Sequence, residues 1–147
     1  MPRLPRLGPA GFDPKAFFEL ARKIGHGRAL GLEFQAAGDN WTELSLPWRE
    51  ELVGVAETGV LASGAIVSLI DTASGTSVWI ALDRFVPILT VDLRLDYLRP
   101  ALKGETITAR CECVKVTRSI AFVRGVAHGG EEKRPIALSA ATFMLNR

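Results

Sequence analysis

Cysteine is scarce in this chain of 147 residues, which contains two. Cys111 and Cys113 stand two positions apart, and this spacing puts both side chains on one face of a strand. Such a pair cannot form a disulfide with itself, and it lacks the further ligands that a metal site needs. We therefore expect two reduced thiols in the core and no metal centre.

An excess of charge of one sign is also missing. Lysine and arginine number 18 and the acids 16, so the formal net charge is +2. This balance argues against a nucleic-acid groove as the main function and makes anionic small molecules the easier ligands. Arg3 and Arg6 have no continuous apolar segment behind them, so we expect no secretory signal and a cytoplasmic location.

One run of the sequence is almost free of charge. Residues 58–82 read TGVLASGAIVSLIDTASGTSVWIAL, and Asp71 is the one charged residue among them. The length suits a membrane span, but the central acid and the many serines, threonines and glycines do not. The run predicts a buried helix and no membrane contact. Since an unpaired buried carboxylate is costly, Asp71 is either a structural acid bonded to hydroxyls or a functional one.

The rest of the chain predicts one domain. Residues 1–12 are rich in proline, glycine and arginine, which predicts a flexible arm, and residues 13–147 predict a single domain with enough apolar material for a core. Asp13 and Pro14 predict the start of a short amphipathic helix that ends before Gly25.

Strand patterns lie on both sides of the central run. Residues 32–37 and 41–48 predict a hairpin across Gly38-Asp39-Asn40. Four more strands are predicted at residues 89–97, 106–116, 119–127 and 136–145. Consecutive strands with short links pair antiparallel, and a helix without a polar face must be wrapped by the sheet. The predicted fold class is α+β.

Two segments carry a resemblance to a known family. GVLASGAIVSLIDTASG, followed about twenty residues later by LTVDLRLDYLRPALKGE, resembles the hotdog-fold acyl-CoA thioesterases of the PaaI-like group, over roughly residues 30–146. The resemblance implies a hotdog fold, here with an extra N-terminal helix. It also implies hydrolysis of an acyl- or aryl-CoA thioester to the free acid and CoASH, without a metal or redox cofactor.

The family pattern transfers only in part. In that family the helix opens with His-Gly-Gly, and an Asp or Glu nine residues after the His is the catalytic carboxylate. Asp71 matches the acid, whereas Ala62-Ser63-Gly64 stands in the place of His-Gly-Gly. Many members also carry an Asn or Gln fifteen residues before the acid, where this chain has Ala56.

Elementary geometry limits what one chain can do. A helix start offers unpaired amides, so those of Ser63 and Gly64, with the Ser63 hydroxyl, can hold an oxyanion. Ser63 and Asp71 are about 12 Å apart along a helix axis, too far to act on one carbon. A two-fold dimer with antiparallel central helices brings one chain's helix start to the other's acid. The resemblance implies such homodimers, often paired into tetramers.

Further candidates each have a structural alternative. Thr90 matches a Ser or Thr that positions the water or the acid in several PaaI-like enzymes, and the alternative is a threonine on the polar face of a strand. Arg99, Lys103 and Arg118 at strand ends suit coenzyme A phosphates, or are ordinary surface cations. Trp79, two helical turns beyond the acid, lines an acyl pocket or packs in the core.

Several alternatives stay open at this point. Asp71 can act as a general base or as a nucleophile. Because Ala62 and Ala56 replace family side chains, a non-catalytic acyl-CoA binding protein is the main rival, and a hotdog dehydratase ranks behind it. His26 near a helix end and His128 in a predicted turn have no spacing that calls for catalysis.

Overall fold

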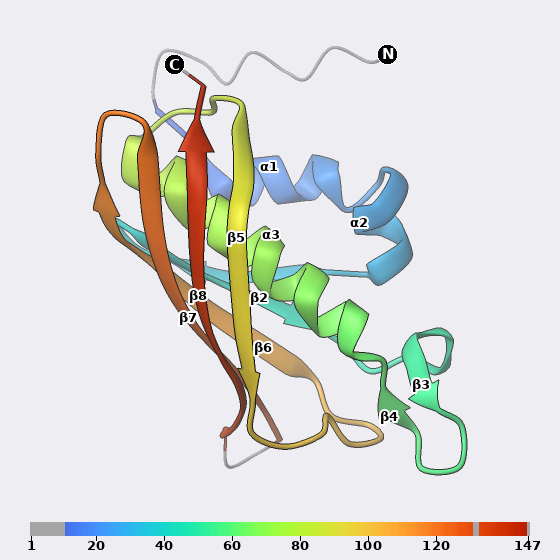
Figure 1. Cartoon of the computed structure of the whole chain (residues 1–147). Coiled ribbons are helices and arrows are strands. Elements are labelled where there is room, and N and C mark those ends of the chain that lie inside the picture. The colour runs from blue at the N-terminus through green and yellow to red at the C-terminus, as the bar shows by residue number, and fades with distance from the viewer. Residues whose placement is uncertain (1–10, 131–132, 147) are drawn as a thin grey trace.

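A curved antiparallel sheet wraps one long helix in the computed structural model, which describes residues 11–130 and 133–146 (Figure 1). The elements are α1 (Pro14–Ala21), α2 (Gly25–Leu30), β1 (Glu33–Ala37), β2 (Trp41–Leu46), the 3-10 turn η1 (Glu50–Leu52), β3 (Val53–Val55), β4 (Val60–Leu61), α3 (Ser63–Leu82), β5 (Ile88–Tyr97), β6 (Ile107–Val116), β7 (Ile120–Gly129) and β8 (Arg134–Leu145). The predicted α+β class is confirmed.

The strand order differs from the chain order. Within the described residues the main sheet runs β1-β2-β6-β7-β8-β5, and β3 pairs only with β4. Consecutive pairing is therefore confirmed for β6–β7 and β7–β8 but is wrong for β5 and β6. β5 is an edge strand next to β8, and the link at residues 98–106 carries the chain from this edge past β8 and β7 to β6 in the middle of the strand order. His128 lies in β7 and not in a turn.

The central helix is shorter than its apolar run. α3 begins at Ser63, Ala62 is its N-cap, and the residues before them form β4 and a turn. By length and composition α3 is apolar enough to cross a membrane, yet more than half of its most apolar window is buried inside the molecule. It is thus packed as a core helix, as the sequence predicts.

The core lies between α3 and the inner face of the sheet. Cys111 and Cys113 both point inward from β6, and both are free, as predicted. Burial raises the pKa of the Cys111 thiol to about 11. On the neighbouring strand a Cβ at Gly125 would lie 2.6 Å from Cys111 Sγ, so glycine is needed there for the two strands to pack.

The N-terminal segment forms two helices where the sequence predicts one. The Asp13 carboxylate accepts a hydrogen bond from Ala16 N at 3.0 Å, which confirms the predicted start of α1. The prediction that this helix ends before Gly25 is also confirmed, but Gly25 then opens a second helix, α2, that the sequence did not predict. Burial of Leu30 outweighs the weak helix propensity of the glycines. Gly31, with φ of 70°, ends α2.

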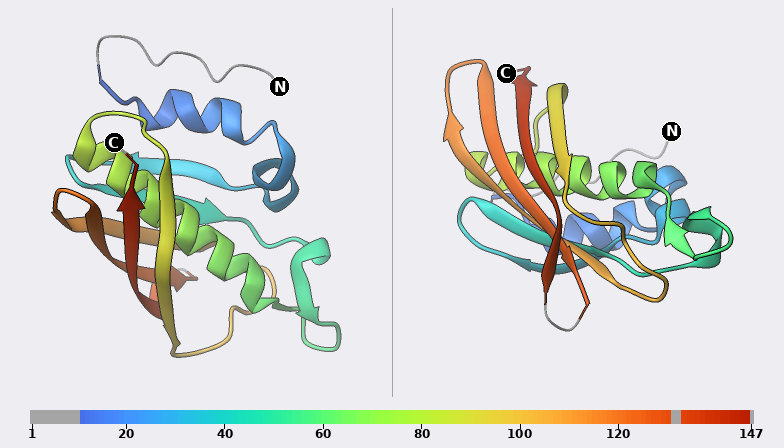
Figure 2. Two further views of the ribbon diagram at one scale, coloured as in Figure 1. Left: turned by 45° about the horizontal axis from the view of Figure 1, so that its top comes forward. Right: turned by 60° about the horizontal axis from the view of Figure 1, so that its bottom comes forward.

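Both short helices lie beside α3 on the side that the curved sheet leaves open (Figures 1 and 2). Residues 1–10 of the predicted arm lie outside the described residues. Its last residue, Phe12, belongs to the packed domain, because it is 8% exposed and its amide donates to Asp83 Oδ1 at 3.1 Å. Helix α1 thereby lies against the C-terminal end of α3, and α2 lies against its second turn, where His26 contacts Ser68.

Candidate functional site

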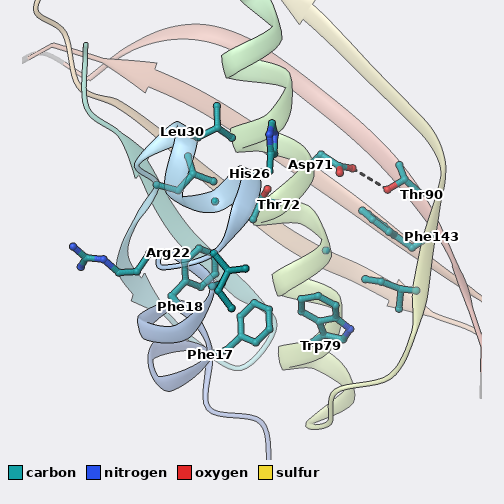
Figure 3. A pocket seen from close by; sticks show the side chains of 16 residues that line it. Phe17, Phe18, Arg22, His26, Leu30, Asp71, Thr72, Trp79, Thr90 and Phe143 are labelled. Carbon is teal, nitrogen blue, oxygen red and sulfur yellow. Dashed lines mark hydrogen bonds between the residues drawn. The ribbon is translucent and has the colours of Figure 1, made fainter. Parts of the chain in front are cut away.

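Asp71 lies half-buried in the third turn of α3, on the wall of a cavity of about 470 Å³ (Figure 3). Its Oδ1 accepts a hydrogen bond from Thr90 Oγ1 at 2.9 Å. The two residues are 19 positions apart in sequence and come from α3 and from β5. The structure therefore brings together the predicted acid and the predicted threonine.

A β-bulge in β5 turns Thr90 toward the acid. Simple alternation along residues 89–97 predicts that Leu89 and Val91 face the core and that Thr90 faces outward. The pairing of β5 with β8 instead shifts between Thr90 and Asp92, so Val91 is an extra residue. Leu89 and Val91 are 64% and 55% exposed, while Thr90 points inward. The alternative of a polar-face threonine is wrong.

The cavity is bounded by α1 and α2 on one side, α3 at the back, and β5 with β8 on the other side (Figure 3). Its lining is largely aliphatic and aromatic and consists of Phe17, Phe18, Ala21, Arg22, Ile24, His26, Gly27, Leu30, Leu32, Asp71, Thr72, Gly75, Trp79, Ile88, Thr90 and Phe143. An apolar cavity with a few polar groups at one place is the usual form of a small-molecule site.

Trp79 lies at the cavity wall and also packs in an aromatic cluster. Its ring lines the cavity, and it also packs against Phe17 and Phe85 at centroid distances of 5.2 and 4.6 Å. Its Nε1–H donates to the carbonyl oxygen of Val86 at 2.8 Å. The indole is therefore held in one orientation at the end of the cavity.

The helix start does not reach the acid within one subunit. Ser63 and Gly64 are the first two residues of α3 and are exposed, and their amides are among those that have no acceptor within a helix. Asp71 is eight residues further on, about 12 Å along the axis. Any joint action of Ser63 and Asp71 requires a second copy of the chain.

Tyr97 is a neighbour of the helix start that the sequence did not suggest. Its hydroxyl donates to the carbonyl oxygen of Ser63 at 3.2 Å, and burial raises the pKa of Tyr97. Both residues line a shallow hollow that extends to Arg99. The exposed end of β5 is thus tied to the first turn of α3.

The three predicted phosphate-binding cations are in different situations. Arg99 forms a two-pronged ion pair with Glu105, at 2.9 and 3.1 Å, and also donates to backbone carbonyls, which leaves little of its guanidinium for a ligand. Lys103 lies 5.9 Å from the ring centroid of Trp48 and lines a second hollow. Arg118 is in the β6–β7 turn, at the far end of β6, about 30 Å from the other two.

The places of the missing family side chains are also resolved. Ala56 lies in the β3–β4 turn and lines the same hollow as Lys103, and Ala62 makes no side-chain cap to α3.

His128, on β7, has its pKa lowered mainly by burial. Within the described ranges, no group of three His, Cys, Asp or Glu side chains is arranged to hold a metal ion.

His26 is a cavity residue that sequence reasoning missed. It comes from α2, and its Nε2 lies 3.2 Å from Ser68 Oγ, one turn before Asp71 on α3. Phe17, Phe18 and Gly75 were likewise not singled out as site residues. No local pattern marks these positions, because only the docking of α1 and α2 on α3 brings them to the acid.

Comparison with known proteins gives a consistent result. The sequence matches the family model of the thioesterase superfamily over residues 58–136, more than half of the chain. The medium/long-chain acyl-CoA thioesterase YigI of Escherichia coli K12 is 32% identical over 131 residues, which cover 80% of this chain and 83% of YigI.

Two solved structures share the fold. Thioesterase HI1161 of Haemophilus influenzae gives a TM-score of 0.81 at 24% identity, over 92% of each chain. The PaaI protein of the Escherichia coli phenylacetic acid degradation operon gives 0.76 at 15% identity, over 88% of this chain and 89% of PaaI. The predicted hotdog fold and the resemblance to PaaI-like proteins are confirmed.

Proposed function

Because the chain belongs to the thioesterase superfamily, we propose that it hydrolyses the thioester of an acyl-CoA to the free acid and CoASH, with Asp71 as the reacting carboxylate. The observation that carries this proposal is the Asp71–Thr90 hydrogen bond on the wall of an apolar cavity. YigI, a thioesterase by name, supports the acyl-CoA class.

The chemistry needs two things at the thioester carbonyl: an attacking oxygen and donors for the oxyanion. As a general base, Asp71 takes a proton from water while the hydroxide attacks the carbonyl carbon. The C–S bond then breaks, and the coenzyme A thiolate leaves and is protonated. As a nucleophile, the carboxylate itself attacks and forms an anhydride that water opens. Thr90 donates to Asp71 Oδ1, which orients the carboxylate in either case.

The oxyanion donors come from a second subunit in this proposal. On α3, Gly64, Val67 and Asp71 follow one another at helical spacing, and Gly64 and Val67 are exposed. If two α3 helices cross antiparallel with Val67 facing its own copy, residue 63 lies opposite residue 71, because both are four positions from Val67. The amides of Ser63 and Gly64 of one chain then face Asp71 of the other.

The edge position of β5 supports this dimer. β5 is at one end of the strand order and exposes Leu89, Val91 and Tyr97. An open edge strand with exposed apolar side chains is a ready site for pairing with another strand. Since Asp71 faces β5, pairing of two β5 edges about a two-fold axis also places the two α3 helices next to each other.

Lys103 is the cation that we propose for the coenzyme A end of the substrate. It is exposed, lines an open hollow with Trp48 and Ala56, and is held near the Trp48 ring. An aromatic face beside an ammonium group suits a nucleotide base and its phosphates. Arg99, already paired with Glu105, and the distant Arg118 have weaker support.

A second candidate function is binding of acyl-CoA without turnover. It is favoured by one observation, the alanines at positions 62 and 56 where thioesterases of this group carry polar side chains. The two functions share a cavity and differ in whether the bound thioester is cleaved.

Assay of CoASH release from short, medium, long and aryl acyl-CoAs separates them. Wild-type protein is expected to release CoASH, and Asp71→Asn to lose about 100-fold or more in kcat, the usual range for a general base. Asp92→Asn, which changes an exposed acid on β5, is the matched control and should keep full activity. Tight binding without CoASH release establishes the second function. An Asp71→Asn variant as active as wild type rules out Asp71 as the reacting carboxylate.

The role of Asp71 can be read from isotope transfer. In a single turnover in H₂¹⁸O, a general base leads to ¹⁸O in the released acid. A nucleophilic Asp71 whose anhydride is opened by water at the Asp71 carbonyl gives an unlabelled acid and leaves ¹⁸O in the peptide that contains Asp71, which mass spectrometry detects. Opening at the acyl carbonyl labels the acid, as a general base does, so ¹⁸O in the peptide is the result that identifies the nucleophile.

A further inference from the structure

The cavity extends from Asp71 along the second half of α3 (Figure 3). Asp71, Gly75 and Trp79 follow at intervals of four residues, so they lie on one face of the helix. At 1.5 Å per residue, the two intervals add up to about 12 Å. A chain that starts with its carbonyl at Asp71 therefore passes Gly75 and meets Trp79.

Gly75 keeps the middle of this path open. A Cβ at this position would lie 3.4 Å from Ile88 Cδ1 and 3.7 Å from Phe143 Cε1, which are ordinary contact distances. An alanine thus fits, and it favours a helix more than glycine does. Packing does not require glycine here. The effect of its missing side chain is the space between α3, β5 and β8.

A fixed aromatic wall closes the far end. The Trp79 indole donates to the Val86 carbonyl at 2.8 Å, and Phe17 and Phe85 pack against it. Phe17 comes from α1 and lines the cavity beside Trp79, whereas Phe85 lies behind and is not part of the lining. Figure 3 shows Phe17 and Trp79 together at the end remote from Thr90.

Resting on the proposed thioesterase activity, we propose that Gly75, Trp79 and Phe17 set the length of the acyl chain and that the preferred substrate is a linear, medium-chain acyl-CoA. Gly75 lets the chain pass, and the Trp79–Phe17 wall stops its methyl end. With about 1.3 Å of length per methylene, a path of about 12 Å holds about eight to ten carbons. A cavity of about 470 Å³ lies in the range of small-ligand sites.

Turnover across saturated acyl-CoAs from four to sixteen carbons tests this assignment. Wild type is expected to show its highest kcat/KM near eight to ten carbons. Gly75→Leu fills the path, so its optimum should move at least four carbons shorter, with decanoyl-CoA losing about tenfold or more. Phe17→Ala opens the wall and should move the optimum longer. Phe122→Ala removes an exposed aromatic on β7 that does not line the cavity, and it should leave the profile unchanged.

Binding gives a second readout that does not depend on hydrolysis. Calorimetry with S-alkyl-CoA thioethers of increasing length should show affinity rising up to about fourfold per methylene and levelling off near ten carbons. In Gly75→Leu the levelling should come earlier, and in Phe17→Ala later. If Gly75→Leu does not fold, Gly75→Ala replaces it in the test, and its length limit should shift in the same direction by a smaller amount.

The outcomes separate this proposal from the proposed function. Hydrolysis with a profile that neither Gly75→Leu nor Phe17→Ala moves leaves the thioesterase intact and overturns the length assignment. If thioether binding shows a length limit, both variants move that limit, and no CoASH is released, the length assignment is supported and the proposed thioesterase activity is ruled out. Affinity that rises without a break to sixteen carbons in wild type overturns the assignment.

Discussion

At the residue scale, the hydroxyl of Thr90 is the feature on which the proposed chemistry depends most. It donates to Asp71 Oδ1 at 2.9 Å and so fixes the rotation of the carboxylate. Thr90→Val keeps the shape of the side chain and removes the donor. We expect kcat to fall about tenfold to a hundredfold with little change in KM, because a hydrogen bond to a charged group contributes about 1.5–3 kcal/mol.

Two further variants make this readout specific. Thr90→Ser restores the hydroxyl and should recover most of the activity, which a purely packing role would not predict. Thr142→Val changes a partly exposed threonine on the adjacent strand, opposite Asp92, and should be neutral. Equal activity in Thr90→Val and Thr90→Ser would show that the carboxylate needs no donor from β5.

At the scale of elements, the loop between β5 and β6 is held by one partly buried ion pair. The Arg99 and Glu105 side chains are 17% and 12% exposed, and Glu105 also accepts from Leu102 N at 2.8 Å. The hydrogen bond from Arg99 is the main cause that lowers the pKa of Glu105 from its ordinary value of 4.5. A carboxyl whose pKa is lower in the folded state stabilises the fold above its unfolded pKa.

Glu105→Gln should therefore destabilise the protein at neutral pH. We expect a loss of about 3 kcal/mol in the free energy of unfolding at pH 7, because the partly buried Arg99 is left without its charged partner. The difference from wild type should shrink below pH 4.5, as the wild-type carboxyl is protonated through its lowered pKa. Urea unfolding at pH 7 and near pH 3 measures both.

The control for this experiment is an exposed pair. Glu43 and Arg110 are 3.1 Å apart, with side chains 29% and 45% exposed. Glu43→Gln should cost no more than about 1 kcal/mol at either pH, since surface ion pairs contribute little. If the two variants lose similar amounts of unfolding free energy, the Arg99–Glu105 pair stabilises the protein no more than a surface ion pair does.

At the scale of the whole molecule, the proposed site is complete only in a dimer. Val67 is 37% exposed and stands midway between Ser63 and Asp71, where the two-fold axis is proposed to pass. Val67→Glu places two like charges face to face on that axis. We expect dissociation to a folded monomer and loss of CoASH release. Light scattering coupled to gel filtration measures the dissociation.

Leu20→Glu is the matched control for the dimer. Leu20 is 40% exposed and lies on α1, not on α3 with Gly64 and Val67, so the variant should stay dimeric and active. A wild-type protein that is monomeric and active removes the shared site. Such a result would leave the Asp71–Thr90 pair to act without the neighbouring helix start.

The sequence indicated both the fold and the acid for local reasons. The uncharged run made a buried helix necessary, and alternating strand patterns required a sheet around it. Asp71 stood out as the one charge in that run, and it does line the cavity. The start of α1 and the inward-facing cysteines were equally local, since a cap or a period of two needs no tertiary contact.

Other features depended on contacts between distant segments. The glycines at positions 25 and 27 disfavour a helix locally, yet α2 forms because Leu30 is buried. The bulge at Val91 reverses the local alternation, and its cause is the pairing of β5 with β8. β5 lies at the edge of the sheet because residues 98–106 then cross to β6, and no residue pattern in residues 98–106 predicts that crossing.

By itself, then, the sequence determined that a long apolar helix carries a single acid inside an antiparallel sheet, because hydrophobic periodicity and an isolated charge are properties of the chain alone. The tertiary structure decided what surrounds that acid. Thr90 reaches it only through the bulge, and the cavity exists only because α1 and α2 dock beside α3. Burial and strand pairing between distant segments are collective, so neither neighbour of Asp71 is encoded within one local stretch.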